Sequence, residues 1–330
     1  MVKISVFGES HGECVGAVME GFPAGVAVDN EFVKAQMKRR AGGNSDFTTP
    51  RAEADEVKIV SGVFNGITTG APICVVIANQ NVHSNDYSDI KDKMRPSHSD
   101  YAAYIKYKGC NDYRGGGHFS GRVTAPIVAI GAIAQEYLRQ IGVEVKACVA
   151  QIGAAVGECA SDDLTEQMQA EILAAKGDDS SIGGKIKVVA SGVKAGYGRP
   201  FWDTVEGVLA HKFFAIPAVK AVEFGLGVLF AEARGDKVND QMCVENGEIR
   251  AITNNCGGVL GGITSGEDIV ATLTFKPTPS IAKAQKTVDV STMRDAIIEV
   301  RGRHDPCIIP RACVVAESVM ALGLLDVMEV

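Results

Sequence analysis

The amino-acid sequence predicts an α+β protein. Strand-like and helix-like segments follow one another in a mixed order, whereas a doubly wound sheet would require strict alternation. The 330 residues contain no linker and no low-complexity tract, and 46% of them are hydrophobic, which is enough for a large core. We therefore expect a single domain over residues 1–330.

Three segments show helical patterns, and a fourth helix is expected to end at residues 38–40. Residues 124–141 carry apolar side chains three or four positions apart. Residues 164–175 are amphipathic and follow Asp162-Asp163, a pair suited to cap a helix. Residues 311–328 are apolar on nearly every side, which predicts a buried helix.

Seven apolar runs have the length and composition of strands. They cover residues 2–7, 58–62, 73–78, 143–152, 185–192, 219–224 and 269–275.

Two patterns occur twice along the chain. The letters SGV stand at residues 61–63 and 191–193, and GIT followed by Thr or Ser and Gly stands at 66–70 and 262–266. Each GIT pattern precedes an apolar run. This predicts an ancient duplication that produced two similar sheets related by pseudo-symmetry. Coincidence between two common strand–turn patterns is the alternative.

Charge and cysteine content narrow the class of protein. The net charge of −7 and the pI of about 5.5 argue against a general nucleic-acid binder. Membrane attachment is not expected, because no run of about 18 apolar residues occurs, and no secretory signal is visible. The nine cysteines are scattered and never form C-x-x-C, which predicts free or buried thiols in the cytoplasm and neither disulfides nor zinc.

Polar residues capable of chemistry are concentrated in five loops. Glycines flank His11 in residues 8–12 and allow a sharp turn that presents its imidazole, although a loop histidine is more commonly just exposed. Lys38, Arg39 and Arg40 form a cation cluster. These three side chains either complement the carboxyl end of a helix or clamp a phosphate or carboxylate.

The third loop, residues 95–101, contains His98, which could act as a general acid or base. Asp100 is expected to cap the following helix and to be structural. The fourth loop, residues 114–122, is rich in glycine and precedes a helix, so its backbone N–H groups could hold a phosphate. It matches neither common nucleotide-binding fingerprint.

The fifth loop, residues 301–306, places Arg303, His304 and Asp305 in succession before the last helix. Asp305 could orient a base or accept a proton, whereas His304 could simply be packed. Together the five loops supply cations for an anionic ligand and a workable acid–base set.

Read in order, these loops resemble the chorismate synthase family. The resemblance rests on GESHG at 8–12, RPSHSDY at 95–101, YRGGGHFSGR at 113–122, KPTPSI at 276–281 and GRHDPC at 302–307. It extends to IPAVKAVEFG and GGVLGGITSGEDI and covers nearly the whole chain. No motif is specific alone, but the combination is.

The resemblance implies a β-α-β sandwich with buried helices between two sheets, assembled as a homotetramer. It implies elimination of phosphate from 5-enolpyruvylshikimate 3-phosphate to give chorismate, in the shikimate pathway of aromatic amino acid biosynthesis. Reduced FMN is required in this reaction without net redox change. We expect a monofunctional enzyme that obtains reduced flavin from an external, NADPH-dependent reductase.

The resemblance also assigns roles to residues of this chain. His11 matches the histidine near the leaving phosphate, His98 the one that protonates reduced flavin, and Asp305 an aspartate that relays a proton. Arg39 and Arg40 match anion-binding arginines, and Arg122, Arg114 and Lys212 are further candidates. The expected FMN contacts are His118, Phe119, Ser120, Pro217, Ala218, Gly261, Lys276, Pro277, Thr278, Pro279, Ser280 and Arg303.

Two departures from the family pattern stand out. The usual Arg-Ser-Ser after the three glycines is His118-Phe119-Ser120 here, and a histidine is a poorer fixed cation near neutral pH. An arginine expected after the cation cluster is replaced by residues 44–46, and Arg51 could supply the charge instead.

Two other functions compete with the lyase. The first is a family member that binds flavin or an anion without turnover, which the His118-Phe119 pair would suit. The second, argued without the family, is a generic enzyme that binds a sugar phosphate.

Overall fold

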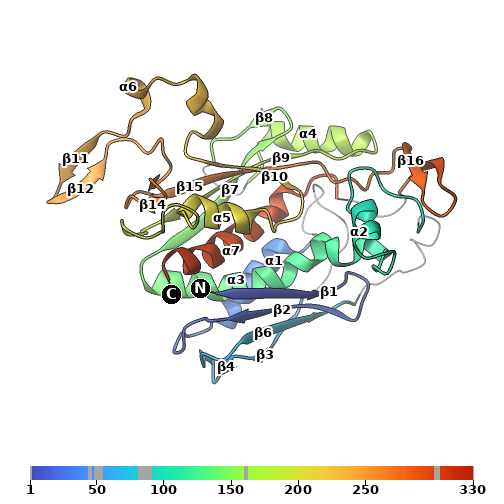
Figure 1. The fold of residues 1–330 in the computed structure, drawn as a ribbon, viewed down its shortest axis with the longest axis horizontal. Helices are drawn as coiled ribbons and strands as arrows, with labels where there is room; N and C mark the ends of the chain where they lie inside the picture. The colour runs from blue at the N-terminus through green and yellow to red at the C-terminus, as the bar shows by residue number, and fades with distance from the viewer. Residues whose placement is uncertain are drawn as a thin grey trace.

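A computed structural model of the chain describes residues 2–43, 47, 55–80, 91–159, 163–300 and 305–329. Two antiparallel sheets enclose a layer of helices (Figure 1). The core formed by these layers is continuous and includes residues of both sheets and of the helices between them. The predicted α+β class and the implied sandwich are confirmed.

The first sheet contains β1 (Lys3–Gly8), β2 (Cys14–Glu20), β3 (Val57–Ser61) and β6 (Ile73–Ala78). Its order is β1-β2-β6-β3, and each neighbouring pair is antiparallel. Strand β2, which the sequence analysis missed, is buried along most of its length in the middle of this sheet.

The second sheet contains β7 (Glu144–Ile152), β8 (Ala155–Val156), β9 (Gly184–Ser191), β10 (Val219–Phe224) and β15 (Ile269–Phe275). Its order is β10-β15-β9-β7-β8, again antiparallel throughout. Residues of β15 alternate between fully buried and half-buried, as expected for a strand with one face on the core.

Helices α1 (Asn30–Arg40), α3 (Thr124–Gln140) and α7 (Ile309–Val327) lie between the sheets (Figure 1). Nearly every side chain of α7 is buried, so the prediction from its all-round apolar surface is confirmed. Helix α7 packs on α3, on α1 and on α5 (Val205–Phe213). The remaining helices are α2 (Asp100–Lys106), α4 (Glu166–Gly177) and α6 (Gly235–Val238), with 3₁₀ turns at Arg114–Phe119, Gly121–Val123 and Gly227–Glu232.

The two sheets share one topology, which supports the predicted duplication. If β1, β2, β6 and β3 are matched with β7, β9, β15 and β10, the orders of the sheets coincide. Two buried threonines occupy matching positions. Thr68 Oγ1 donates to Pro23 O (2.7 Å), and Thr264 Oγ1 donates to Lys194 O (2.7 Å).

Only half of the predicted internal match holds. The GIT patterns lie in matching short hairpins, β4 (Val63–Phe64) with β5 (Ile67–Thr68), and β13 (Val259–Leu260) with β14 (Ile263–Thr264). The SGV patterns do not match. The first lies at the end of β3, whose equivalent in the second half is β10, and the second lies at the end of β9, whose equivalent in the first half is β2. A common strand ending had suggested the wrong pairing.

Two further hairpins lie outside the two large sheets. They are β11 (Met242–Glu245) with β12 (Glu248–Ala251), and β16 (Gln285–Asp289) with β17 (Arg294–Ile298). The β11–β12 hairpin projects away from the sandwich (Figure 1). Together with α6 it belongs to residues 226–256, an insertion that separates β10 from the second GIT hairpin and has no counterpart in the first half.

Two local expectations were wrong. Helix α4 is capped by Thr165, whose Oγ1 accepts a hydrogen bond from Met168 N (3.3 Å), because this residue stands one position before the first turn. The cysteines are not all thiols: Cys148 on β7 and Cys159 form a disulfide with Cα atoms 5.2 Å apart. The turn after β8 brings Cys159 back beside β7, and sequence spacing alone does not predict this proximity.

None of the described helices is long and apolar enough to cross a membrane. The described residues likewise include no group of three or more potential metal ligands.

Candidate active site

Two crossing segments of the chain meet at one end of the sandwich. The described part of the first, residues 79–80 and 91–123, lies between β6 and α3. That of the second, residues 276–300 and 305–308, lies between β15 and α7, so the two segments are equivalent in the two halves. They are joined by hydrogen bonds from Lys276 Nζ to Ser97 O (2.6 Å) and from Arg95 Nη1 to Ser280 Oγ (3.1 Å). In Figure 1 this is the end that carries α2 and β16.

A glycine loop, residues 114–119, separates two of the predicted catalytic histidines. Gly115 and Gly116 have φ angles of 59° and 92°, which favour glycine. A Cβ at Gly115 would lie 2.2 Å from His11 Cε1, and a Cβ at Gly116 would lie 3.2 Å from His98 Nε2. Both imidazoles therefore border adjacent residues of one loop, and the absence of side chains there lets them approach it.

His11 is buried in the turn between β1 and β2. Its Nδ1 lies 3.1 Å from Ser10 Oγ, and Ser10 N donates to Gly117 O (3.1 Å), which ties this turn to the glycine loop. Hydrogen bonds from Arg114 lower the pKa of Asp112, and the nearby His11 adds to this effect. The guanidinium of Arg114 is thus engaged with Asp112 through two hydrogen bonds, and the backbone N of Arg114 donates a third.

Arg95, His98, Asp100, Lys276 and Ser280 form a group that we term the His98 cluster. Asp100 Oδ1 lies 2.5 Å from His98 Nδ1 and accepts from Arg95 Nη2 (2.8 Å). Burial lowers the pKa of His98, as do Arg95 and Lys276, whereas Asp100 opposes the shift. The pKa of His98 lies below 6.5 as a result, which favours a neutral imidazole near neutral pH.

Asp100 does not cap α2 as expected. The N-cap is Ser99, and Asp100 is the first helical residue. Its Oδ2 accepts from Arg95 N (3.1 Å) and Arg95 Nε (2.7 Å), so its carboxylate faces the His98 cluster.

Arg40, Asp55, Arg122, Asp305 and Arg311 form a second group, the arginine cluster. Asp55 is buried and accepts hydrogen bonds from both Arg40 and Arg122. Arg311 Nε donates to Arg40 O (2.8 Å), and its Nη1 donates to Asp305 Oδ2 (2.6 Å). Burial would raise the pKa of Asp55, but the two guanidinium groups outweigh it and hold this pKa below its usual value.

The two clusters are connected into a closed circuit. On one side, Thr278, two residues before Ser280, donates through Oγ1 to Asp305 O (2.9 Å). On the other side, Arg122 N donates to Ser120 Oγ (3.2 Å) at the end of the glycine loop. The loops that carry His11, His98 and Asp305 therefore converge, as the sequence motifs predicted.

Several expected flavin contacts lie along this circuit. Lys276 N donates to Ala218 O (3.0 Å), which brings Pro217 and Ala218 beside the segment 276–280. His118 Nδ1 lies 2.9 Å from Gly8 O, and the neighbouring Phe119 is 38% exposed.

Arg39 and Gly261 are not brought to this circuit. Arg39 forms two hydrogen bonds with Glu317, a buried residue in the middle of α7 (2.5 and 2.9 Å), because it points from α1 into the helix layer. Gly261 lies in the β13–β14 hairpin before β15, whereas Lys276 follows the end of β15. Seven residues of strand separate them, a span of roughly 23 Å.

Lys212, a weaker candidate, pairs with Asp326 (2.7 Å). The predictions for Arg303, His304, Arg51 and residues 44–46 lie outside the described residues.

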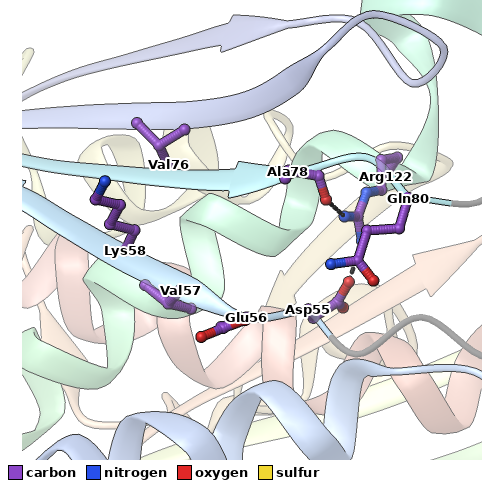
Figure 2. Close-up of a pocket in the computed structure, with 8 residues that line it drawn as sticks. All are labelled: Asp55, Glu56, Val57, Lys58, Val76, Ala78, Gln80 and Arg122. Carbon is purple, nitrogen blue, oxygen red and sulfur yellow. Dashed lines mark hydrogen bonds and ion pairs between the residues drawn. The ribbon is translucent and has the colours of Figure 1, made fainter.

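A pocket of about 470 Å³ adjoins the arginine cluster (Figure 2). Its lining includes Asp55, Arg122, Lys58 and Gln80, and Figure 2 shows Arg122 between Asp55 and the carbonyl of Ala78. Neither His11 nor His98 lines it, so the pocket reaches only one flank of the arginine cluster.

Sequence reasoning missed Asp55 and Arg311 and misjudged Asp100. Arg311 carried a usable signal, because it is a lone cation in the first turn of an otherwise apolar helix. Asp55 carried none, since it is 15 residues from Arg40 and 67 residues from Arg122 along the chain.

Comparisons with known proteins show the family to which the chain belongs. The sequence pattern of the chorismate synthase family matches residues 2–328. A chorismate synthase of Pyrococcus abyssi is 46% identical over 99% of this chain and 95% of its own length. A chorismate synthase of Dehalococcoides mccartyi is 43% identical over 99% and 94%.

A crystal structure of a chorismate synthase superposes with a TM-score of 0.77 and 27% identity, covering 99% of this chain and 91% of that one. With the family pattern and the relatives matched over almost their full lengths, the chain belongs to the chorismate synthase family, a family of lyases that form chorismate.

Proposed function

We propose that this enzyme eliminates phosphate from 5-enolpyruvylshikimate 3-phosphate in the presence of reduced FMN and releases chorismate for aromatic amino acid biosynthesis. The observation that carries the proposal is the circuit that joins the His98 cluster, the glycine loop and the arginine cluster. It combines fixed cations, two imidazoles and a carboxylate at one end of the fold, as acid–base handling of an anionic substrate requires.

The residues present fit a flavin. The glycine loop carries no side chains at residues 115–117 and is followed by the hydroxyl of Ser120, and exposed Phe119 offers an aromatic surface. Lys276 provides a cation, and burial and the nearby Lys220 lower its pKa. We propose that the segments 118–120 and 276–280, with Pro217, Ala218 and Arg303, hold reduced FMN. When bound, it would supply transient electron density to the substrate.

The arginine cluster suits the substrate phosphate and carboxylates. Its three guanidinium groups face two carboxylates, Asp55 and Asp305, which leaves one positive charge in a largely buried setting. Guanidinium groups bind phosphate and carboxylate in a bidentate manner and remain charged when buried. We assign Arg40 and Arg122 to substrate binding, with Arg311 beside them. Arg39 remains a predicted contact whose guanidinium is engaged with Glu317.

The proton chemistry falls to three groups. His11 would lie by the leaving phosphate and donate a hydrogen bond or proton to it. His98, whose pKa is lowered by burial, would exchange a proton at Nε2 beside the glycine loop. Asp305, held by Arg311, would accept the proton that leaves the ring.

The direct test is an anaerobic assay of the purified protein with chemically reduced FMN and 5-enolpyruvylshikimate 3-phosphate. We expect chorismate and phosphate in equal amounts with no net oxidation of the flavin. Absence of product from a folded sample that binds reduced flavin would support the non-catalytic alternative instead. Failure to bind reduced flavin would favour the generic sugar-phosphate enzyme.

We further propose that reduced flavin comes from a separate NADPH-dependent reductase. None of the described residues forms a domain outside the two-sheet sandwich and its insertion that could serve as a reductase. Under air with only NADPH and FMN added, the enzyme should form no chorismate, and addition of a flavin reductase under low oxygen should restore turnover.

We propose that residues 1–330 form one cytoplasmic domain that assembles as a homotetramer. The insertion supports assembly, because none of residues 226–256 is buried in the isolated chain. Val244 and Ile249 are cross-strand partners on β11 and β12 and are 76% and 74% exposed. Exposed apolar surface of this kind marks a contact. Sedimentation should show a tetramer that dissociates when both residues are changed to Lys, and a monomeric wild type would refute the assignment.

A further inference from the structure

We propose that Asp100 is a positioning residue that fixes His98 in the tautomer protonated at Nδ1 and leaves Nε2 as the atom that gains and loses the catalytic proton. The catalytic meaning of this inference rests on the proposed function. Its structural content does not, because the location of a proton on His98 can be measured in the resting protein.

The position of the proton follows from the contact between two side chains. Asp100 Oδ1 and His98 Nδ1 are 2.5 Å apart, so one of them must carry a hydrogen between them. Burial would raise the pKa of Asp100, but hydrogen bonds from His98 and Arg95 hold it well below its usual value, so this carboxylate is ionised. The hydrogen therefore belongs to Nδ1.

Arg95 does not change this assignment. Its Nη2 lies 3.2 Å from His98 Nδ1, but a guanidinium has no acceptor, and Nη2 also donates to Asp100 Oδ1 (2.8 Å). If Nδ1 instead accepted from Arg95, two lone pairs would face each other across the short contact between His98 and Asp100. Arg95 thus orients the carboxylate, and the carboxylate orients the imidazole.

The other ring nitrogen faces the glycine loop. A Cβ at Gly116 would lie 3.2 Å from His98 Nε2, and Gly116 is buried with a φ of 92°. The adjacent Gly115 borders His11 in the same way. Nε2 therefore points toward the part of the site where both imidazoles meet the loop, which is where a reacting group would need a proton.

Both carboxylate oxygens of Asp100 are engaged within the His98 cluster. Oδ1 accepts from His98 and Arg95 Nη2, and Oδ2 accepts from Arg95 N and Arg95 Nε. The N-cap, Ser99, makes no side-chain capping hydrogen bond. A purely structural role in starting the helix would not require the His98 contact.

The surroundings give Asp100 a second effect on His98. Burial and the charges of Arg95 and Lys276 all oppose protonation of the imidazole, whereas the carboxylate of Asp100 favours it. Removing this negative charge should lower the pKa of His98 further. Asp100 would thus set both the location of the proton and the pH range over which it is exchanged.

Solid-state ¹⁵N NMR of histidine-labelled protein tests the tautomer directly. Of the six histidines, His98 is identified by the signal that disappears in His98→Gln. We expect wild-type His98 to be protonated at Nδ1 above its pKa. In Asp100→Ala, which lacks the acceptor, Nε2 protonation should appear, and in the isosteric Asp100→Asn the pKa should fall. An unchanged tautomer in Asp100→Ala together with an unchanged pKa in Asp100→Asn would overturn the proposal.

Kinetics provide the second readout. At neutral pH, Asp100→Asn should lower kcat by about 10- to 100-fold, no more than the lower end of a full general acid–base contribution because His98 itself remains, while KM changes by less than about 3-fold. Asp100→Glu should recover part of the rate. The control is Asp178→Asn, which removes an exposed ion pair with Lys283 and should leave both constants unchanged. A fall in kcat equal to that of the control would contradict the proposal, and a protein inactive in every form would refute the lyase without affecting the NMR result.

Discussion

The arginine cluster and the His98 cluster each place one carboxylate between two basic side chains, but for different purposes. In the arginine cluster, buried Asp55 is shared by two guanidinium groups, Arg40 and Arg122. In the His98 cluster, Asp100 is shared by one guanidinium, Arg95, and one imidazole. Replacing one guanidinium with an imidazole changes the function of the carboxylate from fixing charge to fixing a proton.

The difference corresponds to the two requirements of the proposed reaction. A substrate with phosphate and carboxylate groups needs cations that stay charged at all accessible pH values, which guanidinium groups provide. Proton exchange needs a group that can both bind and release a proton, which an imidazole provides. The two clusters come from equivalent crossing segments and their neighbours, so the duplicated fold brings both requirements to one end.

The largest expected effect comes from removing the carboxylate shared by two arginines. Asp55→Ala leaves Arg40 and Arg122 buried near Arg311 with no neutralising charge between them, which should cost about 3–5 kcal/mol of the free energy of unfolding. Urea unfolding measures the change. Asp178→Ala, at an exposed ion pair with Lys283, should cost no more than about 1 kcal/mol. Equal losses in the two variants would contradict the assigned role of Asp55.

A smaller effect is expected at the link between the arginine cluster and Asp305. Arg311→Gln removes the guanidinium that donates to Asp305 Oδ2 and Arg40 O, so kcat/KM should fall by about 10- to 100-fold, the loss of one to two charge-assisted hydrogen bonds. Arg199→Gln is the matched control, because Arg199 pairs with Glu329 at the surface. A kcat/KM of Arg311→Gln within the range of the control would remove Arg311 from the site.

The pH dependence of stability distinguishes the titrating cluster from the fixed one. Burial holds the pKa of His98 below 6.5 in the folded state, so the unfolded chain binds its proton first as pH falls. The contribution of neutral His98 to the free energy of unfolding is complete above about pH 6.5 and is lost as pH falls toward the folded pKa. Wild type should therefore lose more stability than His98→Gln between about pH 7 and pH 5. Parallel urea midpoints for the two proteins would contradict the lowered pKa.

The smallest effect concerns the glycine loop between the clusters. His118→Arg would replace an imidazole whose Nδ1 contacts Gly8 O with a permanent cation, which should tighten binding of reduced FMN by a few-fold, about 1 kcal/mol. Anaerobic fluorescence titration measures the affinity. Unchanged or weaker binding would indicate that position 118 does not contact the flavin phosphate.

The fold was largely predictable, because hydrophobic periodicity is a local signal. The long apolar run of α7 and the alternation in β15 both reappear in the structure with the expected burial. The predictions failed where one sequence pattern is compatible with more than one structure. The letters SGV end two strands that occupy different places in the sheets, and Cys148 gave no indication of the turn that returns Cys159 to it.

The candidate site was predictable only where a motif gathers residues capable of acid–base chemistry in one loop. His11, His98 and Asp305 were predicted in this way, and the structure brings their loops together. Asp55 was invisible because its partners come from α1 and from the turn before α3, and such contacts arise only on folding. Arg39 and Arg40 meet different partners because adjacent residues of a helix point in directions about 100° apart, which the motif alone does not reveal.

The division of labour between the clusters is tested most directly by the steady-state kinetics of two isosteric variants measured side by side. Asp55→Asn should raise KM for 5-enolpyruvylshikimate 3-phosphate by about 10-fold, roughly 1.4 kcal/mol of binding, while kcat stays within a few-fold of wild type. Asp100→Asn should show the opposite pattern, with the loss in kcat. If both substitutions change the same constant, then charge and proton are not handled by separate clusters and this account of the site is wrong.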